Sequence, residues 1–192
     1  MTETPTTPAR LPRLLVIMGS GETAPTMTVP HRRVFERLAE ATGDQINAVL
    51  LDTPFGFQEN VNELAAKTTD YFRDATGRQV EIAGLARTDR GDVVAIETAI
   101  AKIRSADWLF AGPGSPTFAL RQWKDTAVPI AISEKLQNGG AIVFSSAAAL
   151  TLGRKTIPVY EIYKSGFDPY WVDGLDVLTA IGLPVVVIPH YD

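Results

Sequence analysis

Residues 141–153 read AIVFSSAAALTLG, an apolar run that ends in two serines and continues in small residues. This order is typical of a buried strand that turns sharply into a closely packed helix. A serine at such a turn is lifted out of the sheet, and the next backbone N–H points at a developing oxyanion. We place the strand end near Phe144, which makes Ser146 the tip of the turn. The alternative, that Ser145 and Ser146 only cap a helix, stays open on this stretch alone.

Apolar runs like this one alternate with helical patterns along most of the chain. Strands that are apolar on both faces indicate a parallel sheet covered by helices. We therefore predict one α/β domain over residues 13–192, with a doubly wound, mostly parallel sheet, after a disordered segment over residues 1–12. The expected strands are Leu14–Met18, Ile46–Leu51, Val80–Leu85, Trp108–Ala111, Ala141–Phe144 and Val185–Ile188. The expected helices are Val29–Thr42, Gln58–Ala75, Asp92–Ser105, Pro116–Trp123 and Ala127–Gln137.

Composition excludes several classes of site. The net charge is −4, and the basic residues are scattered, so we expect no nucleic-acid partner. With no cysteine, the chain has no disulfide, no thiolate metal site and no cysteine nucleophile. Its two histidines, His31 and His190, are too few for a multi-histidine metal cluster, and we expect no metal or other cofactor. His31 lies in a basic helical stretch, and we expect it at the surface.

The two ends of the sequence carry expectations about location and completeness. The N-terminus lacks the apolar core of a signal peptide, and no apolar run approaches the ~20 residues of a membrane span. We therefore expect a cytoplasmic protein that does not bind a membrane. The chain stops just after its last expected strand, at Asp192. Since domains seldom end on a core strand, we expect the sequence to be truncated at its C-terminus.

In doubly wound sheets, ligands bind beyond the carboxyl ends of the strands. His190 directly follows the strand expected at Val185–Ile188, so it can come within hydrogen-bond reach of Ser146. The Gly-rich turn at Gly112–Ser115 precedes a helix that begins at Pro116, and its N–H groups can bind an oxyanion or a carboxylate. A plain strand-to-helix connection explains that turn equally well.

The segment GSGETA, Gly19–Ala24, permits a rival prediction. It fits the Gly-x-Gly-x-x-Ala pattern of dinucleotide-binding loops, and Asp52 ends the second strand where a ribose-binding acid stands. Pro25 and the residues after it, however, delay the next helix. That delay keeps the helix N-terminus away from a pyrophosphate, so nucleotide binding is the weaker alternative.

Three short motifs, in the same order, resemble the S51 serine peptidases, the group of aspartyl dipeptidase and cyanophycinase. Gly114–Leu120 resembles their Gly-Gly-Asn-Thr-x-x-Leu loop. Ser146–Ala148 resembles their Ser-Ala-Gly elbow, and Pro189–Tyr191 resembles their Pro-His-Phe/Tyr segment. The resemblance extends from about residue 14 onward. It implies a class I glutamine amidotransferase-like fold and a serine hydrolase acting on peptide or amide bonds, with Asp-containing peptides as the favoured substrates.

The resemblance also implies roles for individual residues. Ser146 is the expected nucleophile, His190 the general base and Glu161 the acid of the triad. The other expected site residues bind the oxyanion or substrate: Gly114, Ser115, Ala147, Gly19, Ser20 and Gly21. No cofactor is implied, and the expected partner is a small peptide or amide substrate.

Departures from the family pattern keep a second alternative open. Ser115-Pro116 replaces the family's Gly-Asn, and proline has no N–H to donate. Phe144 and Ala148 occupy positions where an elbow usually has glycine. A catalytically inactive or divergent amidotransferase-like binding protein fits these residues too. Glutamine amidotransferases themselves use a cysteine, which this chain lacks.

Residues 154–183 interrupt the strand–helix rhythm with aromatic residues, glycine and proline. Tyr160, Tyr163, Tyr170 and Trp171 are large amphipathic rings that are rarely exposed without a use. They can line a substrate site or form a contact between two copies of the chain. A homodimer is therefore an expected partner state, and both uses stay open.

Overall fold

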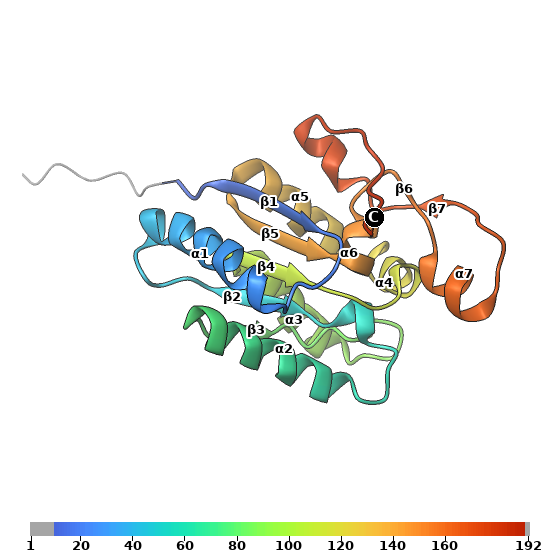
Figure 1. Cartoon of the computed structure of the whole chain (residues 1–192), viewed down its shortest axis with the longest axis horizontal. Coiled ribbons are helices and arrows are strands. Elements are labelled where there is room, and N and C mark those ends of the chain that lie inside the picture. Colours follow the sequence, from blue (N-terminus) through green and yellow to red (C-terminus); the bar gives the residue numbers. More distant parts are fainter. Residues whose placement is uncertain (1–9, 191–192) are drawn as a thin grey trace, which may run out of the picture.

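Five parallel strands form the central sheet in the computed structural model, which describes residues 10–190 (Figure 1). The order across the sheet is β1-β5-β4-β2-β3. The predicted doubly wound α/β architecture is confirmed, and within the central sheet every pairing is parallel. The strands are β1 (Arg13–Met18), β2 (Ala48–Leu51), β3 (Glu81–Ile82), β4 (Trp108–Ala111) and β5 (Gly140–Ser145).

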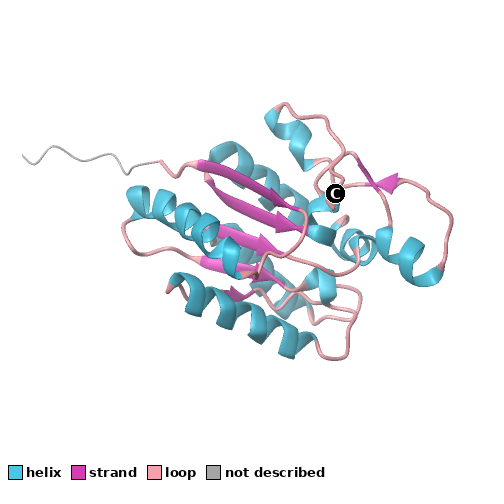
Figure 2. Ribbon diagram, viewed as in Figure 1, coloured by secondary structure: helices cyan, strands magenta, loops and turns pink. Residues whose placement is uncertain are grey.

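The chain crosses the sheet in one direction from β1 to β3 and then returns through β4 to β5. Because crossovers between parallel strands are right-handed, this reversal places the two sets of connecting helices on opposite faces. Helices α1 and α2 cover one face, and α3 and α5 cover the other (Figures 1 and 2). The helices are α1 (Thr28–Thr42), α2 (Val61–Thr76), α3 (Val93–Ser105), α4 (Pro116–Trp123) and α5 (Val128–Asn138).

Alternation along the strands divides the apolar core into two layers. Trp108 and Phe110 of β4 pack in the layer under α1 and α2, whereas Leu109 and Ala111 pack in the opposite layer. All four side chains are buried, as are their neighbours on β2 and β5. Successive residues of a strand point to opposite faces, so a strand buried on both sides is apolar throughout.

The N-terminal segment joins the sheet before β1 begins. Residues 1–9 of the segment expected to be disordered lie outside the described residues. Arg10 donates hydrogen bonds to the carbonyls of Gln137 and Asn138, and the Pro12 carbonyl accepts one from Gly140 N–H. These contacts align β1 with β5 at the sheet edge. None of the helices in the described part of the chain is long and apolar enough to cross a membrane.

Residues after Thr151 form a small C-terminal region beside the carboxyl ends of the strands (Figure 1). It contains a two-stranded antiparallel sheet and two short helical segments. The segment η3 packs against α5 through the buried Val177 and Leu178. The elements are β6 (Lys155–Thr156), α7 (Val159–Ser165), β7 (Val172–Asp173) and η3 (Val177–Ile181).

The strand predicted at Val185–Ile188 is wrong. A strand forms a ladder of hydrogen bonds with a second backbone beside it. Among the described residues, this segment makes one backbone hydrogen bond to another part of the chain, from Arg154 N–H to the Val185 carbonyl. Val187 is buried, but Val185, Val186 and Ile188 are exposed. The segment is nevertheless directed so that the C-terminal end of the described chain lies beside the end of β5 (Figure 1).

Candidate active site

The side chains of Ser146 and His190 are in hydrogen-bond contact beyond the carboxyl end of β5. Ser146 Oγ lies 3.1 Å from His190 Nε2, although the two residues are 44 positions apart. When the Nδ1 nitrogen carries the ring proton, Nε2 accepts the serine hydroxyl proton. The arrangement is therefore one in which a histidine base can activate a serine nucleophile.

A sharp turn between β5 and helix α6 (Ser146–Thr151) presents Ser146. Its φ is +48°, in the left-handed region that residues other than glycine rarely occupy. Ser145 has the N-cap position of α6, but its hydroxyl makes no capping bond and is buried without a partner among the described residues. Capping therefore does not explain the pair of serines, and the turn has the geometry of a nucleophile elbow.

The two unusual elbow residues are accommodated by the core. Phe144 lies inside β5, before the turn, and its ring packs 6.1 Å from that of Trp123. Ala148 is fully buried, and its N–H donates to the Gly112 carbonyl at 3.3 Å. Neither residue needs a glycine conformation, because the strained angle falls on Ser146 alone.

The loop after β1 approaches the His190 backbone closely at Gly19. A Cβ atom added to Gly19 would lie 3.2 Å from His190 N. A side chain at position 19 would therefore push the histidine backbone away. The φ of His190 is +62°, so both members of the pair have left-handed backbone angles. Strain of this kind is concentrated at functional sites.

The loop after β4 supplies backbone N–H groups beside the elbow. The Ser115 N–H donates to the Pro54 carbonyl at 2.8 Å, so it is not free to bind an oxyanion. Gly114 and Ala147 have N–H groups with no hydrogen-bond partner within residues 10–190. Of the three backbone donors expected at Gly114, Ser115 and Ala147, the described structure leaves Gly114 and Ala147 available.

A buried polar cluster supports this loop from below. The short helix η2 (Thr53–Phe55) presents the Pro54 carbonyl, and a Cβ on Gly114 would lie 1.9 Å from that oxygen. Trp123 Nε1 donates to Thr53 Oγ1 at 2.8 Å, and Leu85 N–H donates to Asp52 Oδ1 at 2.9 Å. Burial raises the pKa of Asp52, and the hydrogen bond from Leu85 partly offsets that rise.

Glu161 of α7 contacts the same loop. Its carboxylate accepts a hydrogen bond from the Thr117 hydroxyl, and Thr117 Oγ1 lies 3.0 Å from Ser115 Oγ. Ser115 Oγ in turn accepts the Phe118 N–H and caps α4. Among the described residues, no hydrogen bond joins Glu161 to His190. The role of Glu161 as the acid that orients His190 stays a prediction.

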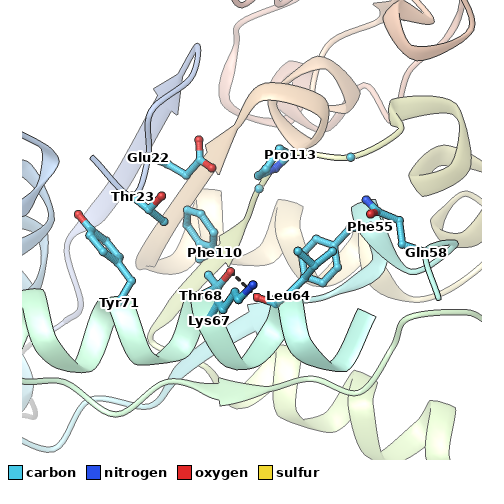
Figure 3. A pocket seen from close by; sticks show the side chains of 12 residues that line it. Glu22, Thr23, Phe55, Gln58, Leu64, Lys67, Thr68, Tyr71, Phe110 and Pro113 are labelled. Atoms are coloured by element: carbon cyan, nitrogen blue, oxygen red, sulfur yellow. Dashed lines mark hydrogen bonds between the residues drawn. The ribbon is translucent and has the colours of Figure 1, made fainter. Parts of the chain in front are cut away.

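A pocket of about 450 Å³ opens next to the β4 loop. One wall is the loop residues Gly112, Pro113 and Gly114, and Glu22 and Thr23 from the β1 loop lie near them. Helix α2 forms the opposite side, and the rings of Phe55 and Phe110 stand between (Figure 3). The volume suits a ligand of the size of an amino acid or a short peptide.

The geometry does not favour the nucleotide alternative. The glycine loop is followed by η1 (Pro25–Met27), and α1 begins only at Thr28. Asp52 is 4% exposed and is engaged by Leu85, so it offers no free carboxylate to a ribose. Among residues 10–190, no group of three or more His, Asp or Glu side chains is arranged to hold a metal ion.

Several solved structures are similar to this chain, and two of them are described here. A peptidase from an acI-B1 actinobacterium superposes with a TM-score of 0.71 at 19% identity, covering 92% of this chain and 68% of the other. A protein from Listeria monocytogenes EGD-e, provisionally assigned as peptidase E, superposes with a TM-score of 0.55 at 16% identity, covering 92% and 78%. The chain has a peptidase S51-like fold. No family model and no curated protein matches the sequence.

Within this S51-like fold, three residues in or beside the pocket were not predicted from the sequence. His31, which we expected at the surface, is 1% exposed, and its Nε2–H donates to the Glu22 carbonyl at 2.7 Å. Its burial lowers its pKa. Lys67 and Tyr71 of α2 line the pocket. Their spacing from Leu64, at three and seven residues, is a helix-face pattern that can be read from the sequence.

Proposed function

We propose that this chain is a serine hydrolase that cleaves a peptide or amide bond. The observation that carries the proposal is the 3.1 Å contact between Ser146 Oγ and His190 Nε2, with the serine on a strained turn. A serine hydroxyl is a weak nucleophile without an adjacent base, and here a base is in reach. The two similar structures, which are described as peptidases, support the same class of reaction.

The reaction begins with attack of Ser146 Oγ on the substrate carbonyl carbon, as the hydroxyl proton passes to His190 Nε2. The N–H groups of Ala147 and Gly114 stabilise the resulting oxyanion. His190 then gives the proton to the leaving amine as the C–N bond breaks, which leaves an ester on Ser146. A water molecule attacks that ester, its proton passes through His190 to Ser146 Oγ, and the carboxylic acid departs.

Glu161 has a positioning role in this scheme. The chain of hydrogen bonds from Glu161 through Thr117 to Ser115 orders the turn that carries Gly114. We also propose that Glu161 orients His190. The family resemblance favours Asp-containing peptides as substrates.

Intact-mass analysis after incubation with a fluorophosphonate probe tests the proposal. We expect one adduct on the wild type and none on Ser146→Ala. Ser145→Ala is the matched control, because the Ser145 hydroxyl is buried next to the elbow without a partner, and it should be labelled like the wild type. His190→Ala should be labelled at least about a hundredfold more slowly.

Two results contradict the proposal. Labelling that persists in Ser146→Ala places the reactive group elsewhere. An unlabelled, folded wild type favours the second candidate, a binding protein without catalysis. That candidate is supported by the Ser115 N–H, which Pro54 already occupies.

A further inference from the structure

The pocket beside the β4 loop is bordered by the segments that hold the Ser146–His190 pair. Gly112 and Gly114 form one rim, and Gly112 also accepts the Ala148 N–H of the elbow helix. Glu22 forms another rim and belongs to the loop whose Gly19 packs against His190. A residue whose carbonyl carbon is next to Ser146 therefore has this pocket within reach.

Of the two charged side chains that line the pocket, one is paired and the other is not. The Glu22 carboxylate makes no ion pair or hydrogen bond with any residue between 10 and 190. The Lys67 ammonium, on α2 across the pocket (Figure 3), is already paired with Glu63 at 2.7 Å. The uncompensated charge is thus negative, and it lies on the loop whose Gly19 approaches the His190 backbone. A cation complements that position.

The backbone at Glu22 is fixed from two sides, and this sets the point at which its side chain leaves the loop toward the pocket. His31 Nε2–H donates to the Glu22 carbonyl at 2.7 Å. The Tyr71 hydroxyl donates to the Ala24 carbonyl at 3.2 Å, and Ala24 N–H closes a turn on the Gly21 carbonyl at 2.8 Å. The interior is mixed: Phe55, Leu64 and Phe110 give it an apolar wall, and Thr23, Gln58, Lys67, Thr68 and Tyr71 add polar groups (Figure 3).

We infer that the pocket binds the amino-terminal residue of a peptide, with the α-ammonium on Glu22 and an apolar side chain against Phe55, Leu64 and Phe110. This inference rests on the proposed function for the identity of the bond that is cleaved. It departs from the Asp-containing peptides that the family resemblance favours, because it makes the substrate a peptide with a free amino terminus and an apolar, preferably aromatic, first residue. Cleavage then occurs directly after that residue.

Binding to the Ser146→Ala protein tests the inference without requiring catalysis. The probes are L-phenylalaninamide, N-acetyl-L-phenylalaninamide and L-aspartic acid α-amide, measured by calorimetry. We expect L-phenylalaninamide to bind at least about tenfold more tightly than N-acetyl-L-phenylalaninamide, because only the free ammonium makes a charge-assisted contact to Glu22. It should also bind more tightly than L-aspartic acid α-amide, which has the same ammonium but no apolar side chain for the pocket. Addition of Glu22→Gln should remove the difference between the free and the acetylated amine. Addition of Glu59→Gln should not, because Glu59 is exposed and outside the pocket.

A second variant tests the cavity itself rather than the charge of Glu22. Thr68→Phe places a ring in the cavity from α2, and it should abolish binding of L-phenylalaninamide while the fold is retained. Equal binding of the acetylated probe, or preference for the aspartic acid amide, overturns the inference even if Ser146 is labelled by fluorophosphonate. Conversely, an unlabelled wild type that still binds L-phenylalaninamide through Glu22 overturns the proposed hydrolase and leaves the pocket assignment intact.

Discussion

Ser146 stands at the end of a fully buried strand, whereas His190 stands at the end of a segment whose apolar side chains are mostly exposed. The serine is held by β5, by the packed alanines of α6 and by a hydrogen bond from Ala148 to the β4 loop. The histidine is held by its approach to Gly19 and by the buried Val187 upstream. The contact between Ser146 and His190 is therefore supported unequally from its two sides.

This difference separates fold stability from catalytic geometry. Contacts around the elbow belong to the main core, so weakening them costs global stability before it displaces Ser146. Contacts around His190 are few, so weakening them displaces the base before the protein unfolds.

Gly114→Ala should damage both the site and the fold. The added Cβ would lie 1.9 Å from the Pro54 carbonyl oxygen, and Gly114 has a φ of +149° that an L side chain rarely adopts. The loop must move, which withdraws an oxyanion donor, and loss of one donor lowers the rate by about a hundredfold or more. We expect that loss in the rate of fluorophosphonate labelling, together with a lower melting temperature.

Gly77→Ala is the control for Gly114→Ala. Gly77 also has a positive φ, +73°, but a Cβ there meets no atom within 4 Å. It should lower stability by about 1 kcal/mol and leave labelling unchanged. Similar labelling of the two variants would show that the close approach at Pro54 is irrelevant to the site.

Val187→Ala and Val143→Ala should have opposite consequences. Val143 is fully buried in β5, and its truncation should reduce the free energy of unfolding by about 2 kcal/mol with labelling within about twofold of wild type. Val187 anchors the segment before His190, and its truncation should reduce stability by only about 1 kcal/mol. Labelling of Val187→Ala should nevertheless fall about tenfold, because small displacements of a catalytic group are costly.

Denaturant unfolding and labelling of the folded fraction measure both quantities on each variant. If Val143→Ala loses labelling and Val187→Ala keeps it, the elbow is the weakly held side and the comparison is reversed. If both variants lose labelling equally, the supports of Ser146 and of His190 do not differ in strength.

Much of the fold can be predicted from local sequence because its signals are local. The strand at Trp108–Ala111 and the helix at Pro116–Trp123 were placed at their observed ends, the helix because Ser115 caps it and Pro116 suits its first turn. The elbow at Ser146 was readable for the same reason: an apolar run, a serine and small residues are adjacent in the chain.

Features that depend on distant neighbours were not readable. The apolar run at Val185–Ile188 has the composition of a strand, but strand formation depends on a partner backbone that composition does not reveal. The basic residues around His31 indicate exposure, yet His31 itself faces the opposite side of α1 and packs among Tyr71, Phe72 and Phe110. The pocket was not predicted either, because only the fold brings Glu22 and Lys67 to the same cavity.

The smallest predicted effect is the pH dependence of stability that the buried His31 causes and the exposed His190 does not. Burial lowers the pKa of His31 below its ordinary value of 6.5, whereas His190 is exposed. Below pH 6.5 the unfolded chain binds a proton at His31 that the folded chain resists. Stability from this residue is therefore complete above pH 6.5 and declines as the pH falls from 6.5 toward the lower folded pKa, by at most about 1.4 kcal/mol per pH unit.

Urea unfolding between pH 7.5 and 5 should show this decline in the wild type and in His190→Ala. It should be absent from His31→Phe, in which an aromatic ring that cannot be protonated occupies the same buried position among the same aromatic neighbours. A decline that follows His190 instead would mean that the exposed histidine, not the buried one, is coupled to folding. The two regions that hold Ser146 and His190 would then not differ in the way their burial indicates.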